Sequence, residues 1–251
     1  MKKRIIYYIA ICLATLSASS CSKFDNYDAP DQTLKGTVTD VNTGKAVQTE
    51  VTGDNTAGTR IKIIELSWSP TATPQFLASF QDGTYINTKI FAGTYRMTVE
   101  GAFVPLVQTT PVVDNGKTVE VRGGTTTVDF AVEPFLRVEW VGEPVLNANG
   151  TVTATYKITR GTANPLFQQN ITDAYLFANG TKYVGNNNFM LAWSTKTTYA
   201  GNAANALLGT NQTITTPVLP KTREVYLRIG ARIAFGANIY NYNEVKMITV
   251  P

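Results

Sequence analysis

The chain has 251 residues, of which 43% are hydrophobic and 16% charged, with 22 lysines and arginines against 18 aspartates and glutamates. Three of those 22 basic residues lie within the first four positions, leaving 19 against 18 acidic residues, a balance that argues against nucleic acid as a partner. The chain has no histidine, which excludes Ser-His-Asp triads, Cys-His nucleophiles and histidine metal sites.

The N-terminus has the layout of a secretory signal over residues 1–20: basic residues, an apolar run over 5–16, and small residues up to Cys21. The apolar run is 12 residues long, whereas a transmembrane helix needs about 20. We therefore expect cleavage. The small residues before the cysteine resemble the bacterial lipobox, in which signal peptidase cuts before a cysteine that carries a diacylglyceryl thioether, although Ala18 stands where leucine is usual.

Cysteine usage favours lipidation at Cys21 over an ordinary secreted protein that merely has a cysteine near its cleavage point. Cys12 is removed with the signal, so the mature chain keeps one cysteine and forms no internal disulfide. A triacylated cysteine supplies the several acyl chains that stable anchoring needs. Residues 21–33 then form the lipidated cysteine and a polar tether, whose acidic residues resemble the surface-export signal of Bacteroidetes lipoproteins. The cell surface and the periplasmic face of the outer membrane both stay open as locations.

From residue 34 onward apolar and polar residues alternate at a period of two, and no stretch keeps a helical period, so we predict an all-β protein. Turns are expected at 42–44, 82–83 and 92–93. Short strands at this spacing indicate a β-sandwich. The strands expected in this half are 34–40, 60–68, 76–80, 85–90, 94–100, 117–122 and 126–132.

Two segments carry a family resemblance: GTVTDVNTGKAV at 36–47 and DGTYINTKIFAGTYRMTV at 82–99. They resemble the carboxypeptidase-regulatory-like domain, a transthyretin-like β-sandwich, which we assign to residues 34–133. This resemblance implies a non-catalytic accessory module. With the lipobox and a second β half, the whole chain resembles a family of Bacteroidetes lipoproteins of unassigned function. That family is commonly encoded beside the transporter and glycan-binding lipoprotein of starch-utilisation-like systems, which implies these proteins and an oligo- or polysaccharide as partners.

The second predicted domain covers residues 134–251. Its start is placed at Pro134, because proline lacks a ladder donor and favours an extended residue before it. Asn179 and Gly180 form the strongest hairpin signal in the chain. The pattern indicates an immunoglobulin-like or fibronectin-like sandwich, and the missing disulfide makes the fibronectin type the nearer comparison. The strands expected here are 135–141, 151–158, 175–177, 182–184, 224–234 and 244–250.

An irregular segment over 185–212 interrupts the second half and leaves two interpretations, a core-plugging strand or short helix and a ligand-facing loop. Four aromatic residues lie among asparagines and are our candidate ligand contacts, with a core or edge position as the alternative for each. Sugar rings pack on aromatic faces while polar side chains bond the hydroxyls, the usual makeup of small-ligand sites. The four residues are Trp193, Tyr199, Tyr240 and Tyr242.

Catalytic motifs are missing from the sequence. It contains no G-x-S-x-G and no phosphate-binding glycine loop. Asp54, Asp114 and Asp173, the best carboxylate candidates, lie in turn-like contexts without the ligand spacing of a calcium loop. We predict a non-catalytic protein without metal or cofactor. Two functions stay open: an accessory glycan-binding lipoprotein of the outer membrane, and a structural or adhesion protein that docks on a transporter through a sandwich edge.

Overall fold

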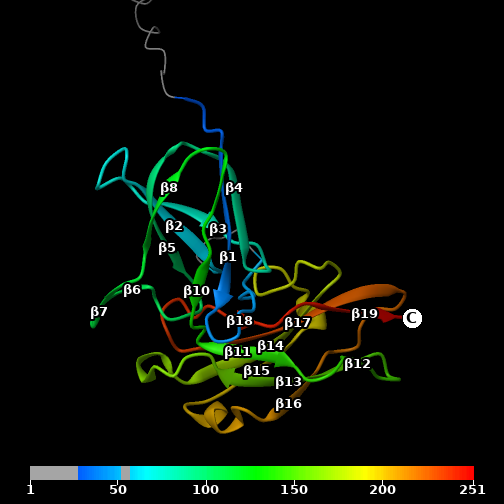
Figure 1. Ribbon diagram of the computed structural model, residues 1–251. Helices are drawn as coiled ribbons and strands as arrows, with labels where there is room; N and C mark the ends of the chain where they lie inside the picture. Colours follow the sequence, from blue (N-terminus) through cyan, green and yellow to red (C-terminus); the bar gives the residue numbers. More distant parts are fainter. Residues whose placement is uncertain (1–27, 52–56) are drawn as a thin grey trace, which may run out of the picture. The chain divides into compact units, whose positions relative to one another are not determined.

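Two sheets in the first half pack face to face, and β6 and β7 pair with each other in a separate hairpin (Figure 1). This computed structural model describes residues 28–51 and 57–251, so the predicted signal, Cys21 and Asp54 lie outside the described residues. One sheet has the order β10-β1-β4, with β9 also pairing β1, and the other has the order β3-β2-β5-β8. The strands are β1 (Gln32–Asp40), β2 (Arg60–Glu65), β3 (Gln75–Ala78), β4 (Thr84–Ile90), β5 (Gly93–Glu100), β6 (Val107–Thr109), β7 (Val112–Asp114), β8 (Lys117–Val121), β9 (Thr125–Thr127) and β10 (Phe130–Val132).

The first core follows the predicted alternation. Tyr95, Met97 and Val99 on β5 are buried, as expected from their common face. β2 ends at Glu65, three residues earlier than predicted, because a turn follows in which the N–H groups of residues 66 and 67 both donate to the Thr94 carbonyl.

The predicted strand over 126–132 is divided into β9 and β10, which both run parallel to β1. Between them the Asp129 carboxylate accepts from the Thr37 N–H at 2.8 Å. The carboxylate oxygen stands where the backbone carbonyl of a paired strand would otherwise accept this bond.

The second half is also a two-sheet sandwich, and its core lies between the sheets. One sheet joins β11, β12 and β16 to β13, and the other has the order β15-β14-β17-β18, with β19 also on β17. The alternating residues predicted to face inward on β13 and β17 are buried. The strands are β11 (Leu136–Trp140), β12 (Val145–Leu146), β13 (Val152–Arg160), β14 (Ile171–Asn179), β15 (Thr195–Thr198), β16 (Asn211–Thr215), β17 (Arg223–Ile233), β18 (Asn241–Tyr242) and β19 (Lys246–Val250), with 3-10 helices at Pro165–Phe167, Leu191–Trp193 and Ala203–Leu207.

The predicted hairpin around Asn179 and Gly180 is wrong. Residues 182–184 form no strand, and β14 pairs instead with β17 and with β15. Nearly every residue of β14 is buried, on both faces of the sheet, and its two neighbours, β15 and β17, are formed by segments farther along the chain. The Asn179 side chain bonds Asn188 at 3.0 Å, and the segment after it folds back over the sheet.

The irregular segment over 185–212 connects the two sheets of the second half. It supplies β15 to one sheet, and its end begins β16, which pairs with β13 in the other. Trp193 and Tyr199 pack half-buried against the core on the way. This arrangement is closer to the core interpretation than to a free ligand loop.

The whole of Asp31–Pro251 forms one compact unit made of strands and three 3-10 helices, which confirms the all-β class with two tandem sandwiches. Two tandem sandwiches with a boundary at Pro134 predict domains that fold independently. In the structure, Ala102 of the first half packs in the core of the second, and the Phe135 N–H donates to the Ala102 carbonyl across the boundary. Within the described residues, no helix is long and apolar enough to cross a membrane.

Candidate functional site: a groove between the two sandwiches

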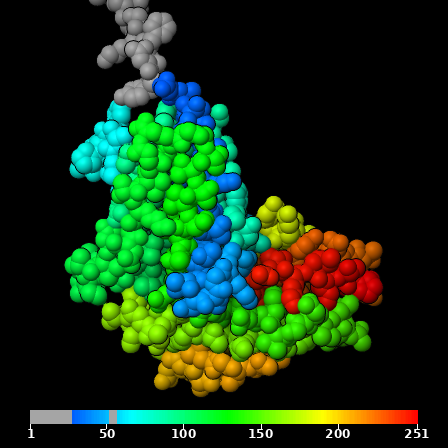
Figure 2. Space-filling view, in the orientation of Figure 1, coloured from blue at the N-terminus to red at the C-terminus, as the bar shows by residue number. Residues whose placement is uncertain are grey.

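A groove with a volume of about 330 Å³ lies where the two sandwiches meet. Residues 43–48, which follow β1, form one side, and β11 with residues 241–246 forms the other. Figure 2 shows the blue segment after β1 lying beside the red C-terminal segment. The volume is at the lower end of the roughly 300–1,000 Å³ that small-ligand pockets span.

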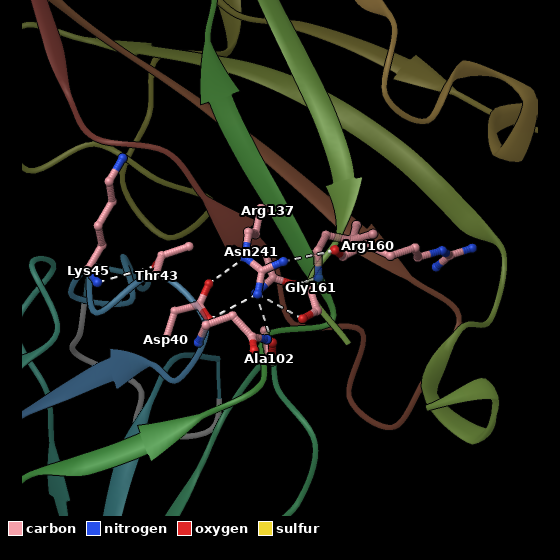
Figure 3. A network of polar contacts seen from close by, with 10 residues as sticks. Asp40, Thr43, Lys45, Ala102, Arg137, Arg160, Gly161 and Asn241 are labelled. Carbon is pink, nitrogen blue, oxygen red and sulfur yellow. Dashed lines mark hydrogen bonds and ion pairs between the residues drawn. The ribbon is translucent and has the colours of Figure 1, made fainter. Parts of the chain in front are cut away.

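An ion pair between Arg137 and Asp40 joins the halves at the groove (Figure 3). Arg137 Nε donates to Asp40 Oδ2 and Nη2 donates to Oδ1 at 3.0 Å, while Nη1 and Nη2 also donate to the carbonyls of Arg160 and Gly161. Burial alone raises the pKa of the Asp40 carboxyl, but the bonds from Arg137 and from the Asn42 N–H outweigh it, and the pKa is lowered.

The turn after β1 sets the position of Asp40. Asp40 Oδ1 accepts from the Asn42 N–H at 2.9 Å, and the Asp40 carbonyl accepts from the Gly44 N–H at 2.8 Å. Gly44 has φ +69°, a conformation that suits glycine. The turn predicted at 42–44 is therefore confirmed, and it leaves Lys45 exposed at the rim of the groove.

The outer edge of β11 faces the groove. The Leu136 N–H donates to Asn241 Oδ1 at 3.1 Å, so this residue points away from β13. Donor and acceptor directions alternate along an antiparallel strand, and the N–H and C=O groups of Val138 and Trp140 point the same way. No strand pairs with this edge in the part of the chain that the structure describes.

Trp140 provides an aromatic wall of the groove. Its Nε1 donates to the Glu244 carbonyl at 2.7 Å, and the Lys246 ammonium lies 5.5 Å from the ring centroid. Lys246 is itself held by the Gly142 carbonyl and the Glu143 carboxylate. The ring is thus fixed in orientation beside charged and amide groups.

Asn243 lines the groove and has an amide nitrogen that is buried behind the groove surface. Its Oδ1 accepts from the Ile229 N–H at 2.7 Å, which fixes the orientation of the amide. Its Nδ2 is buried and has no hydrogen-bond partner among the described residues. An unsatisfied buried donor costs about 1–3 kcal/mol.

A buried polar cluster behind the groove ties the halves together. Arg228 is fully buried and donates to the carbonyls of Asn243, Val184 and Gln81, at 2.9, 3.2 and 3.3 Å. Its guanidinium lies 4.2 Å from the Tyr242 ring centroid. Burial lowers the pKa of Arg228 to about 10, so it stays charged at neutral pH. The alternation along the strand expected at 224–234 predicts Arg228 on its polar face, and in the structure the first half covers that face.

Glu50 completes this cluster from the first half of the chain. It is 1% exposed, and its carboxylate accepts from the Tyr242 hydroxyl and, at 2.9 Å, from the Asn186 N–H. Burial and the neighbouring Glu50 carboxylate raise the pKa of Tyr242 well above its ordinary value, so the phenol remains a donor.

The predicted platform of four aromatic residues does not form, and this expectation is corrected. Tyr240 and Tyr242 are only 4% and 6% exposed and belong to an aromatic cluster on the outer face of the β14–β17 sheet. The Tyr240 hydroxyl bonds Asp173 there. Trp193 and Tyr199 pack instead against the core between the sheets.

The difference has a physical reason. The strands expected at 224–234 and 244–250 predict a loop over 235–243 that carries Tyr240 and Tyr242. In the structure, residues 241–242 form β18 on the edge of β17, and the first half covers the face on which these tyrosines lie. Of the four rings only Tyr242 lines the groove. The sequence analysis did not single out Trp140 as a candidate ligand contact. The one feature that could have indicated it is its place near the end of a predicted strand, between Glu139 and Glu143.

The two described aspartates that were weighed as catalytic candidates are engaged in ion pairs. Asp173 is paired with Arg232 at 2.9 Å and with Lys196 at 3.7 Å, and Asp114 is paired with Arg96. Within residues 28–51 and 57–251, no cluster of three carboxylate or cysteine side chains could hold a metal ion.

Two tandem β-sandwiches with a groove between them define the structural class, and comparison with known proteins gives the family. Residues 32–133 match the N-terminal domain of the protein of unknown function DUF3823, and residues 141–247 match the domain of unknown function DUF3823_C. The crystal structure of a DUF3823 family protein from Bacteroides uniformis ATCC 8492 is 32% identical, with a TM-score of 0.80 over 88% of this chain and 100% of that chain. The chain belongs to the DUF3823 family, which confirms the expected Bacteroidetes family of unassigned function.

Two further structures resemble the chain over 88% of its length and 100% of theirs. One, also from Bacteroides uniformis ATCC 8492, is described as a candidate carbohydrate-binding protein, with 26% identity and a TM-score of 0.65. The other is a DUF3823 family protein from Parabacteroides merdae ATCC 43184 at 21% identity and a TM-score of 0.65, which supports the fold alone. No curated protein matches the chain.

Proposed function

We propose that this protein is a non-catalytic, lipid-anchored outer-membrane protein that binds a saccharide in the groove between its two sandwiches. The observation that carries the proposal is the coincidence, in one groove, of the Trp140 ring and the unpaired N–H and C=O groups on the outer edge of β11. The relative described as a candidate carbohydrate-binding protein, at 26% identity, supports the same class of ligand.

The groove offers what a sugar requires. A pyranose ring has an apolar face that packs on an aromatic ring, and its hydroxyls both donate and accept hydrogen bonds. The open β11 edge presents N–H and C=O groups of Val138 and Trp140 in alternation, which suits such hydroxyls. The lining carries three positive charges and three negative charges, so the groove favours a neutral saccharide; the charged residues are Lys45, Arg137 and Lys246, and Asp40, Glu139 and Glu244. We expect dissociation constants of about 0.01–1 mM.

The ligand proposal is tested on soluble protein lacking residues 1–30, with a panel of neutral oligosaccharides measured by calorimetry. Trp140→Ala should weaken binding at least about tenfold, whereas Trp140→Phe, which keeps a ring face, should retain most of it. Trp68→Ala is the matched control, because Trp68 is 67% exposed and does not line the groove. Equal binding by wild type and Trp140→Ala, with both proteins folded, would exclude the groove as the site.

The membrane anchor rests on the sequence around Cys21 and has its own experiment. Cys21→Ser should abolish incorporation of labelled palmitate in the native host and release the protein from the membrane fraction. Label that persists on the variant would refute lipidation at this residue, whatever the outcome of the saccharide screen.

The open edge of β11 also supports a second function, docking of a transporter or another surface protein by strand addition. A partner strand would use the same N–H and C=O groups of Val138 and Trp140. Val138→Pro removes one of these donors. Loss of a co-purifying surface protein in this variant, combined with no saccharide binding by the wild type, would favour docking.

A further inference from the structure

A second and larger cleft, with a volume of about 530 Å³, lies in the first half of the chain. It is formed by the outer face of β2 and β5, by residues 103–107, and by Asp114 at the end of the β6–β7 hairpin. Figure 1 shows this hairpin close to β5. The cleft shares no lining residue with the groove between the sandwiches, so it is a separate site.

The alternation of the two strands places charged side chains on this outer face. On β2, Ile61 and Ile63 are buried in the core, so Lys62 and Ile64 point outward. The register sets Lys62 opposite Thr98 of β5, with Ile64 opposite Arg96. These four residues line the cleft.

The hairpin is fixed against the sheet. Arg96 Nη2 donates to Asp114 Oδ1, and the same oxygen accepts from the Gly116 N–H at 3.1 Å. The Arg96 guanidinium passes close to Gly116, where a Cβ would lie 2.6 Å from Arg96 Nη2. The Asn115 N–H donates to the Leu106 carbonyl at 2.9 Å and closes the base of the hairpin. The cleft is therefore preformed.

Two lysine or arginine residues and two carboxylates line the cleft, and Arg60, outside the lining, adds a third positive charge beside it. Glu100 is paired with Arg60 at 2.8 Å, and Asp114 is paired with Arg96, so each carboxylate is neutralised by an arginine. Lys62 makes no hydrogen bond or ion pair with any residue that the structure describes. One positive charge is left without a partner at the floor of the cleft.

The facing wall is aliphatic. It consists of Pro105, Leu106 and Val107, with Ile64 on the floor beside Lys62. The aromatic residue of the lining, Phe103, is 1% exposed and offers no ring face. This wall suits an alkyl body better than a sugar ring.

We propose that this cleft binds an organic carboxylate with an apolar body, with the carboxylate on the Lys62 ammonium and the body against Ile64, Leu106 and Val107. The carboxylate supplies the missing negative charge, in a charge-assisted hydrogen bond. The apolar body covers the aliphatic wall and so removes its surface from water. Neither half of such a ligand suffices, because a small anion leaves the wall wet and a neutral alkyl chain leaves the lysine unpaired.

Three ligands separate the contribution of the charge from that of the apolar body: octanoate, octan-1-ol and acetate. Each is titrated into soluble protein lacking residues 1–30. Binding is followed by the NMR shifts of the methyl groups of Ile64 and Val107. Octanoate should bind at least about tenfold more tightly than either of the others, since one charge-assisted bond accounts for about that factor. Octan-1-ol binding as well as octanoate would overturn the role of Lys62, and acetate binding as well would overturn the role of the apolar wall.

Lys62→Met keeps the aliphatic stem of the lysine and removes its charge, so it should weaken octanoate binding about tenfold and leave octan-1-ol binding unchanged. Lys89→Met is the matched control, an exposed lysine on β4 of the opposite sheet.

Val107→Asp, at a position 50% exposed, should repel the carboxylate without disturbing the core. Equal weakening by the control, or none by Lys62→Met, would overturn the proposal. Saccharide binding in the groove should be unaffected by all three changes.

Discussion

At the residue scale, Asp40 connects local and long-range structure. One carboxylate accepts from the Asn42 N–H of its own turn and, on both oxygens, from Arg137 in the second sandwich. Its side chain is 7% exposed, so these bonds are sheltered from water. The same atoms shape the turn, join the halves and line the groove, which makes this residue the most sensitive point of the proposed saccharide site.

Asp40→Asn should lower the free energy of unfolding at pH 7 by about 1–3 kcal/mol, since Arg137 loses a charged acceptor. The pKa of Asp40 is lowered in the folded state. Its contribution is therefore present above the unfolded pKa, near 3.9, and disappears as the pH falls through the lower folded value. Urea unfolding at pH 7, 5 and 3 should show the difference between variant and wild type shrinking only below about pH 4. Asp31→Asn, at an exposed residue, serves as control. A difference that is constant down to pH 3 would contradict this assignment.

At the scale of elements, β1 organises the first sandwich because it pairs with β4, β9 and β10. This crowding leaves no room for a side chain at Gly36. A Cβ there would lie 1.9 Å from the Val128 carbonyl oxygen, which already accepts from the Tyr85 hydroxyl. The glycine is required by close approach of a neighbouring backbone, and β1 leads directly into Asp40 at the groove.

Gly36→Ala should destabilise the protein by about 1–3 kcal/mol, the usual cost of an overpacked core. Gly180→Ala is the matched control, since its Cβ would meet nothing closer than Trp193 at 4.0 Å. Denaturant unfolding of both variants at one pH measures the contrast. Similar stabilities for the two alanine variants would show that β1 and the chain around Val128 separate more easily than the packing indicates.

At the scale of the whole molecule, buried polar groups couple the two sandwiches. Glu50 and Gln81 come from the first half and reach Tyr242 and Arg228 of the second. Gln81 also accepts from the Val184 N–H at 3.1 Å. A buried charge that loses its partner is costly. The halves are therefore expected to depend on each other for stability, in contrast to the independent folding that the sequence predicted.

We expect residues 31–251 to unfold in one cooperative transition, measured by hydrogen exchange in each half. Glu50→Ala leaves the Tyr242 hydroxyl and Arg228 without their buried carboxylate and should cost about 3–5 kcal/mol. Glu65→Ala, at a half-buried glutamate on β2 of the first half, is the control. Two transitions in the wild type, or a fragment 31–133 as stable as the full unit, would restore the independent model.

The sequence alone determined the features that depend on local pattern. The period-two alternation specified the all-β class and the buried faces of β5, β13 and β17, because side chains on a strand alternate between faces. The turn at 42–44 could be read from Asn42 and Gly44, because turn conformations select those residue types. The position of the groove beside that turn could not be read in this way.

The tertiary structure alone decided which polar and aromatic residues meet. The strand pattern predicted an outward-facing Arg228, and Tyr242 was expected as a ligand contact in a loop, yet the first half buries both with Glu50, which lies 192 positions from Tyr242. The hairpin expected after β14 failed for the same reason, since a strand buried on both faces takes its partners from distant segments. Trp140 and Asn243 line one groove because the two halves pack there. Burial at a contact between distant segments is set by the packing of the whole chain, and periodicity within one strand carries no information about it.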